Sequence, residues 1–244
     1  MRQRIAAIVA VWAARSAWAV LGALAAPSLP AAPGTQKHVA SLALNGMLRA
    51  DVPVASIKTL RERATVRQRY DFSCGSAAVA TLLTHHYGQP VNEQQAFEAM
   101  YAHGDQAAIR RAGFSLLDIQ RFLAARGLRA DGFQQPLQAL LDAAVPAIVL
   151  INDNGYRHFV VIKGGANGRV LLGDPARGTR AISRAAFDAI WVGRLLFLIH
   201  GYSGPVRFNH PEDWRAAPLP PLAEGIDRAS LAQRTLPGHG PGDF

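Results

Sequence analysis

Apolar residues in the first half of the chain recur at the spacing of helices that bury one face. The run from Cys74 to Tyr87 carries Leu82 and Leu83 at this spacing and stops at Gly88. Three further helices are predicted on the same grounds, from Asn92 through Met100, from Ser115 to Gly127, and from Leu137 to Ala144.

The hydrophobic period changes in the second half of the chain. Short β-branched or Leu-rich runs bounded by turn residues predict four strands: PAIVLIN, YRHFVVIK, RVLLGD and RLLFLIH. Asp153-Asn154-Gly155 is typical of a hairpin turn, and so is the run from Gly164 to Gly168. Helices first and antiparallel strands second predict an α+β fold.

The second of these turns predicts a strand register. With Ala166 at the centre of the turn, His158 on one strand faces Asp174 on the next. Directly opposed side chains have Cβ atoms about 4.5–5.5 Å apart, so Asp174 can accept the imidazole N–H of His158 and fix its tautomer. Asn152 or Asp153 could take the place of Asp174 if the register differs.

The one cysteine of the chain, Cys74, stands at the start of the first predicted helix. Unpaired N–H groups and the helix dipole at that end favour a thiolate, which is the nucleophilic form. Gly75 leaves room for a substrate backbone, and Gln68 can fold back to donate its amide N–H to an oxyanion. A buried small side chain and a solvated glutamine are the ordinary alternatives. A Cys, a His and an Asp together indicate a thiol hydrolase.

Three stretches, QRYDFSCGSAAVATLL, HFVVIKG and VLLGDPARG, resemble the C39 family of bacterial cysteine peptidases. Their shared pattern is a Gln, then Cys-Gly opening a helix, then His-Phe-Val-Val on a strand, then Asp-Pro-x-x-Gly. The resemblance covers roughly residues 66–200. It implies a papain-like fold, with N-terminal helices packed on a C-terminal antiparallel sheet. It also implies roles for four residues: Cys74 as nucleophile, His158 as general base and then acid, Asp174 as orienting carboxylate, and Gln68 as oxyanion donor.

The chain departs from the family pattern in two respects. Ser73 occupies the position before the cysteine where family members often carry Asp, and we expect Ser73 and Gly75 to contact substrate. Many family members are the N-terminal domain of an ABC transporter and cleave leader peptides after Gly-Gly, but this sequence has no G-x-x-x-x-G-K phosphate loop. It therefore resembles a stand-alone, exported branch without ABC transporter domains. For this chain the resemblance therefore implies neither dependence on ATP nor cleavage after Gly-Gly.

Composition narrows the possible partners and cofactors. The formal net charge is +9, but Lys and Arg are scattered, so no nucleic-acid partner is predicted. A single cysteine excludes an internal disulfide and a Cys-rich zinc site. His85 and His86 point in different directions on a helix and are interpreted as surface histidines rather than a metal site. No dinucleotide, phosphate or haem motif occurs, so no cofactor and no metal are expected.

The N-terminus has the shape of a signal peptide. Arg2 and Arg4 precede an apolar run that closes on small residues, although Arg15 interrupts it. Arg15 has two explanations: translation starts further downstream, or residues 16–26 alone form the apolar region. A cleaved signal is the first interpretation and an uncleaved anchor the second. Membrane association is expected only through this segment. An exported, periplasmic or envelope-associated protein is predicted. The expected parts are a signal peptide or anchor at 1–32, a lead-in segment at 33–65, a peptidase domain at 66–202 and a Pro/Gly-rich extension at 203–244.

The preferred interpretation is an exported cysteine peptidase that cleaves a peptide or protein substrate through a Cys-His-Asp triad and an acyl-enzyme. Acyl or peptidyl transfer through the same thioester is the alternative among enzymes. The alternative that is not an enzyme is a papain-like module that binds peptides in an envelope or secretion assembly and has an idle thiol.

Overall fold

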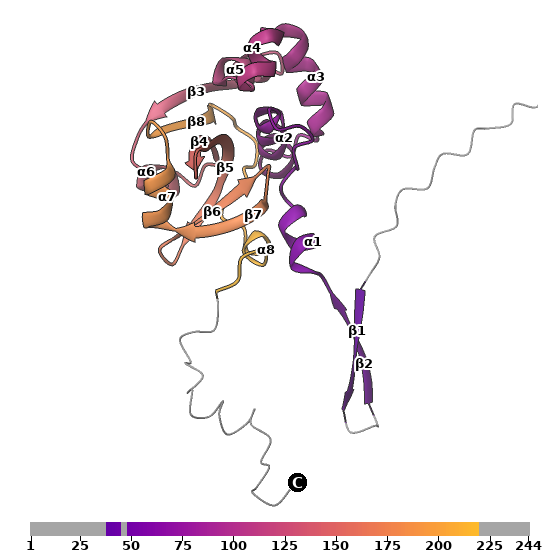
Figure 1. The fold of residues 1–244 in the computed structure, drawn as a ribbon. Coiled ribbons are helices and arrows are strands. Elements are labelled where there is room, and N and C mark those ends of the chain that lie inside the picture. The colour runs from indigo at the N-terminus through magenta and orange to yellow at the C-terminus, as the bar shows by residue number, and fades with distance from the viewer. Residues whose placement is uncertain (1–37, 45–47, 220–244) are drawn as a thin grey trace, which may run out of the picture. The chain divides into compact units, whose positions relative to one another are not determined.

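The protein is built on a six-stranded antiparallel sheet, seen in a computed structural model that describes residues 38–44 and 48–219 (Figure 1). The spatial order of the strands is β3-β8-β4-β5-β6-β7. In chain order they are β3 (Arg129–Gln134), β4 (Ala147–Asp153), β5 (Tyr156–Ala166), β6 (Arg169–Asp174), β7 (Gly178–Ser183) and β8 (Leu195–His200).

The helices precede or flank this sheet, which confirms the predicted α+β class. The described helices are α1 (Ile57–Glu62), α2 (Cys74–His86), α3 (Glu93–His103), α4 (Gln106–Ala112), α5 (Leu116–Ala124), α6 (Leu137–Ala143), α7 (Arg184–Ile190) and α8 (Pro211–Trp214). The four predicted helices correspond to α2, α3, α5 and α6. Asn92 and Ser115 begin α3 and α5 with capping boxes, as their spacing to Gln95 and Asp118 allows.

Two hydrophobic cores cover the two faces of the sheet. Helices α2, α3 and α5 pack over the face that presents Phe159 and Val161 of β5. Helices α6 and α7 pack over the opposite face, which presents Val160 and Ile162 (Figure 1). The alternation along β5 is that of a strand buried on both sides, which explains its continuous apolar run. This central strand carries His158 into the interior.

The register predicted for β5 and β6 is wrong. Asn167 and Gly168 both have positive φ, 51° and 68°, and form a two-residue turn, so β5 extends to Ala166 instead of ending before it. A bulge between Ile162 and Gly164 then shifts the pairing once more.

As a result, Val161 faces Gly173 and not Leu171. His158 and Asp174 are therefore not directly opposed, although they remain close enough for their side chains to meet. The other predicted hairpin is confirmed, because Asn154 and Gly155 have φ of 54° and 87° and join β4 to β5.

Several elements were missed because their sequences lack an apolar run. Strands β3 and β7 are the two edges of the sheet, and most residues of β3 are exposed. In the predicted lead-in segment, β1 (His38–Leu44) pairs with β2 (Leu48–Val54) and α1 follows. The predicted signal segment at 1–32 and residues 220–244 lie outside the described residues. In the part of the chain that is described, no helix has the length and apolarity to cross a bilayer.

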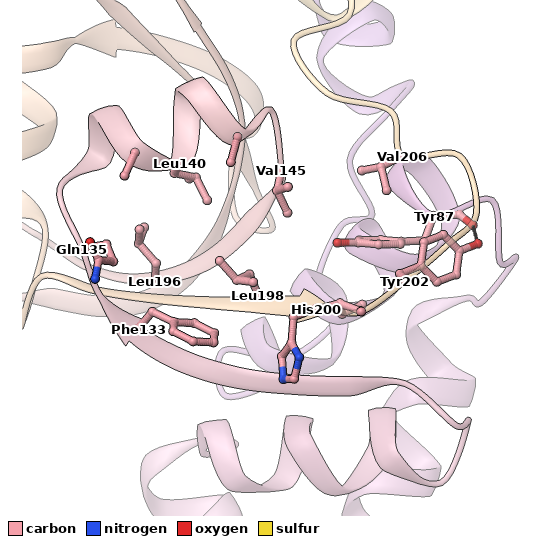
Figure 2. Close-up of a pocket in the computed structure, with 14 residues that line it drawn as sticks. Tyr87, Phe133, Gln135, Leu140, Val145, Leu196, Leu198, His200, Tyr202 and Val206 are labelled. Atoms are coloured by element: carbon pink, nitrogen blue, oxygen red, sulfur yellow. Dashed lines mark hydrogen bonds between the residues drawn. The ribbon is translucent and has the colours of Figure 1, made fainter.

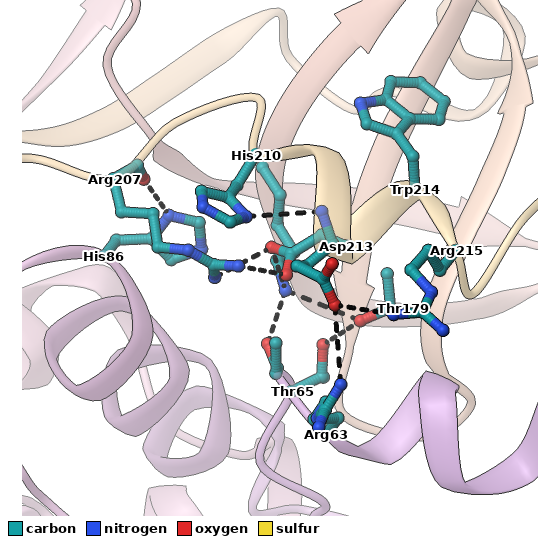
Figure 3. Close-up of polar contacts among 12 residues, drawn as sticks. Arg63, Thr65, His86, Thr179, Arg207, His210, Asp213, Trp214 and Arg215 are labelled. Carbon is teal, nitrogen blue, oxygen red and sulfur yellow. Dashed lines mark hydrogen bonds and ion pairs between the residues drawn. The ribbon is translucent and has the colours of Figure 1, made fainter. Parts of the chain in front are cut away.

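A buried ionic network attaches the segment after β8 to the domain (Figure 3). Lys163 is fully buried, and its Nζ lies 2.9 Å from Oδ2 of Asp213. Arg207 places NH2 2.7 Å from Oδ1 of the same carboxylate. Burial lowers the pKa of Lys163 to about 8, although Asp213 acts in the opposite direction. Lys163 also donates to the carbonyl of Ala64, so the network reaches the segment ahead of α2.

His86 belongs to this network, so its interpretation as a surface residue is wrong, while His85 is half-buried. The His86 side chain is buried, and Nδ1 lies 2.6 Å from the carbonyl oxygen of Arg207. Burial and the charge of Lys163 lower the pKa of His86 to about 3. The residue therefore acts as a neutral donor to the backbone.

The pKa of His86 predicts a loss of stability in acid. Between about pH 6.5 and 3 the unfolded chain binds a proton that the folded chain does not, so the free energy of unfolding falls as pH falls. We expect His86 to account for about 2–3 kcal/mol of the loss between pH 7 and 4.5. Urea denaturation at the two pH values measures it. The loss should shrink by this amount in His86→Gln, with His103→Gln as the exposed control. An unchanged loss in His86→Gln would contradict the assignment.

Candidate active site

Cys74 is the first residue of α2, as the sequence predicts. Ser73 precedes it as the N-cap but gives the helix no side-chain hydrogen bond. Its hydroxyl instead donates to the Tyr70 carbonyl at 3.0 Å and accepts from the Tyr70 N–H at 3.1 Å. The N–H groups at the start of α2 are thus left to act on the thiol.

The thiol is largely enclosed, since Cys74 is only 7% exposed. Burial raises its pKa, while the backbone N–H groups of Phe159 and Gly75 act in the opposite direction. The net shift is upward, so the thiol in this arrangement is protonated at neutral pH. A base is needed to make it a nucleophile.

His158 and Asp174 are in contact, and the residue after His158, Phe159, turns its backbone N–H to the Cys74 thiol. Nε2 of His158 lies 3.3 Å from Oδ1 of Asp174, and both side chains are almost fully buried. The contact is an ion-pair distance rather than a well-directed hydrogen bond, because Nε2 has no hydrogen-bond partner of good geometry among the described residues. Burial alone would raise the pKa of Asp174, but His158, Arg180 and the Ala176 N–H together hold it below its usual value. The carboxylate therefore stays ionised beside the imidazole.

Arg180 and Asp153 complete the surroundings of Asp174. Nε of Arg180 lies 2.9 Å from Oδ2 of Asp174, and its NH2 lies 3.3 Å from Asp153. Arg177 also pairs with Asp153, at 2.7 Å. Asp153 is thus paired with two arginines, and the carboxylate that contacts His158 is that of Asp174.

Gln68 lies in the segment ahead of α2, held there by its backbone N–H, which donates to the Pro175 carbonyl at 3.1 Å. Its Nε2 donates to the Tyr70 carbonyl at 3.1 Å and to the Tyr156 hydroxyl at 3.4 Å. Its Oε1 is buried without a partner among the described residues. Gln68 is therefore near the end of β6, but its amide is occupied by neighbouring groups.

Gly75 has a packing reason to be glycine. A Cβ added at this position would lie 2.8 Å from Cβ of Phe114, which is closer than real contacts allow. Ser73 is fully buried and bonded to Tyr70. The substrate-contact role predicted for these two residues stays a prediction.

Sequence reasoning missed the aromatic side chains around the site. Tyr70 and Phe72 stack on each other with centroids 5.7 Å apart, and both contact Phe97. Tyr156 stacks on His158 with centroids 4.7 Å apart. Each stacked pair is two positions apart in the sequence, whereas Phe97 lies on α3, so only the fold shows the contacts of Phe97 with Tyr70 and Phe72.

A cavity of about 430 Å³ lies elsewhere, between α6, β3, β8 and the segment that follows β8 (Figure 2). Its lining is mainly apolar, with Leu140, Leu196 and Leu198 on its walls and Tyr87 and Tyr202 at one end. None of the four predicted catalytic residues lines it. Among the described residues, no three His, Cys, Asp or Glu side chains form a group that could hold a metal ion.

A cysteine that opens a helix, packed against an antiparallel sheet whose central strand carries a histidine, characterises the papain-like cysteine peptidases. Comparison with known families narrows this class. Residues 62–202 match the peptidase C39 family, and the chain belongs to it. The family predicted from the sequence motifs is thereby confirmed.

Two curated relatives are each described as a probable functional amyloid protease, FapD. The Pseudomonas aeruginosa protein is 40% identical over 148 residues, which are 61% of this chain and 65% of the relative. The Pseudomonas fluorescens protein is 37% identical over 163 residues, which are 66% of this chain and 72% of the relative. Among solved structures, the peptidase domain of Streptococcus ComA, a bi-functional ABC transporter, aligns with a TM-score of 0.47 at 22% identity, covering 58% of this chain and 98% of that domain.

Proposed function

We propose that this protein is an exported cysteine peptidase that cleaves a peptide or protein substrate with Cys74, His158 and Asp174. The observation that carries the proposal is the buried contact of 3.3 Å between His158 and Asp174, together with the Cys74 thiol facing the backbone N–H of Phe159, the residue after His158. An ionised carboxylate in that place orients the imidazole and stabilises its charged form.

The proposed reaction has two steps. Sγ of Cys74 attacks the peptide carbonyl carbon while His158 takes the thiol proton, and His158 then gives that proton to the leaving amine as the C–N bond breaks. Water attacks the resulting thioester, gives a proton to His158, and releases a carboxylic acid and the free thiol. Gln68 and the backbone N–H of Cys74 donate to the oxyanion of each tetrahedral intermediate.

Export and the nature of the substrate belong to the same proposal. The signal-like N-terminal sequence supports export to the periplasm or envelope. The description of two relatives as probable functional amyloid proteases supports a protein substrate from a functional amyloid system.

Alkylation of the single cysteine tests the catalytic assignment. Because burial raises the pKa of Cys74, fast reaction at pH 6 requires a base that takes the thiol proton. We expect iodoacetamide to modify the full wild-type chain at pH 6 about tenfold faster than His158→Ala, with Asp174→Asn in between. The modified fraction is followed by intact-mass spectrometry.

His103→Ala removes an exposed histidine and is the matched control, expected to react like wild type. Equal rates in wild type and His158→Ala would contradict the triad and favour a peptide-binding module with an idle thiol. The alternative among enzymes is tested by turnover of a peptide in the presence of an added amine. Transfer of the acyl group to that amine, at the expense of hydrolysis, would indicate an acyl or peptidyl transferase instead of a peptidase.

A further inference from the structure

Tyr156 lies directly on the catalytic imidazole. It is the first residue of β5, just after the Asn154-Gly155 turn, and its ring stacks on that of His158 with centroids 4.7 Å apart and planes 27° apart. The Tyr156 side chain is 41% exposed, whereas that of His158 is 1% exposed. The phenol ring therefore covers one face of the imidazole and is itself open to solvent.

The hydroxyl of Tyr156 reaches across to the segment ahead of α2. It donates to the carbonyl of Asp71 at 3.2 Å and accepts from Nε2 of Gln68 at 3.4 Å. One side chain from the sheet thus contacts the two sides of the site, the imidazole on β5 and the loop that leads to Cys74.

The Gln68 amide is poorly satisfied in this arrangement. One of its N–H groups is given to the long bond with Tyr156, and its buried Oε1 has no partner among the described residues. The N–H given to Tyr156 is the weakly held one, because its acceptor is a phenol oxygen 3.4 Å away. A substrate oxyanion is a stronger acceptor than a phenol and would compete for this N–H when substrate binds.

We propose that Tyr156 is a displaceable cover of the active site, a positioning residue whose hydroxyl holds the Gln68 amide until a substrate carbonyl takes its place. The proposal rests on the proposed function. Substrate moves the ring off His158, opens access to Cys74 and releases the Gln68 N–H toward the oxyanion. The contacts to be broken are two neutral hydrogen bonds and one ring stack, all at the surface of the site.

The test uses alkylation of Cys74 in the full chain by a bulky maleimide at fixed pH. Tyr156→Ala removes the ring and the hydroxyl, and Tyr156→Phe removes only the two hydrogen bonds. We expect the rate to rise about tenfold in Tyr156→Ala and by a smaller factor in Tyr156→Phe, which retains the stack. Tyr70→Phe is the matched control: Tyr70 is an exposed tyrosine of the neighbouring loop that stacks on Phe72, and its variant should react like wild type.

A second readout is the pH profile of the same reaction, which a purely structural residue would leave unchanged. Burial is the largest cause of the raised pKa of Cys74, and the groups that act on it are the backbone N–H groups of Phe159, Gly75 and Cys74 itself and the charge of Asp174. Removing the cover admits water, so the profile of Tyr156→Ala should move to lower pH while those charges stay in place.

The outcomes separate this proposal from the catalytic one. Unchanged rates in both Tyr156 variants, with wild-type alkylation that still requires His158, would overturn the cover and leave the peptidase intact. Faster alkylation in Tyr156→Ala that does not depend on His158 would support the cover and contradict the triad. Circular dichroism checks folding, and Tyr156→Phe keeps the proposal testable if Tyr156→Ala does not fold.

Discussion

The Cys74→Ala variant is expected to fold normally and to cleave no peptide. Turnover of a pooled library of fluorescence-quenched peptides should fall at least about 10⁴-fold, the order seen when a triad loses its nucleophile. The free energy of unfolding should change by only about 1 kcal/mol, because alanine favours the helix and the substitution removes a single buried atom. Both quantities are measured on the full chain.

Ser73→Ala is the control on the adjacent residue. It removes the hydroxyl that bonds to the Tyr70 backbone but keeps the thiol, so it should retain measurable turnover. Cleavage by Cys74→Ala above a tenth of the wild-type rate would show that Cys74 is not the nucleophile.

The second large effect is on stability, at the buried ionic network. In Asp213→Asn the Nζ of Lys163, fully buried and now without its counter-ion, should lower the free energy of unfolding by about 3–5 kcal/mol. The main cause is the uncompensated charge that is left behind, not the loss of attraction alone. Guanidinium denaturation at pH 7 measures the change.

Glu212→Gln is the matched control, one residue earlier in the chain. Glu212 pairs with Arg63 at 3.5 Å and with Arg215 at 3.1 Å, and all three side chains are largely exposed. Its loss should cost less than about 1 kcal/mol. If Asp213→Asn does not fold, Lys163→Met combined with Asp213→Asn should restore folding, because position 163 then carries no buried charge. Equal effects of the Asp213 and Glu212 variants would contradict the account.

The sequence predicted the two ends of the His158–Asp174 contact but not its geometry. Motif and strand pattern placed His158 on a strand and Asp174 at the end of the next, because both depend on local residues. The register depended on which residues form the turn, and Asn167-Gly168 formed a tighter one than expected. The bulge near Lys163 could not be predicted, since it reflects packing across the sheet.

The ionic network was beyond sequence reasoning for a different reason. Lys163 and Asp213 are 50 positions apart, and neither has a local pattern that marks it as buried. Charged residues are ordinarily exposed, so a sequence assigns them to the surface by default. The contacts of Tyr156 with Gln68 and Asp71 were missed likewise, because they cross between the sheet and the loop ahead of α2.

The ionic network limits how far this chain can be shortened at its C-terminal end. The match to the family ends at residue 202, which makes that position a natural choice for the boundary of a minimal domain. A chain shortened to residue 202 would lack Asp213 and Arg207, yet it would keep Lys163 in the interior with Ala64 and Thr179 as its remaining partners. Such a fragment would have to expose or deprotonate a lysine to fold. We therefore expect the smallest self-sufficient unit to extend through α8.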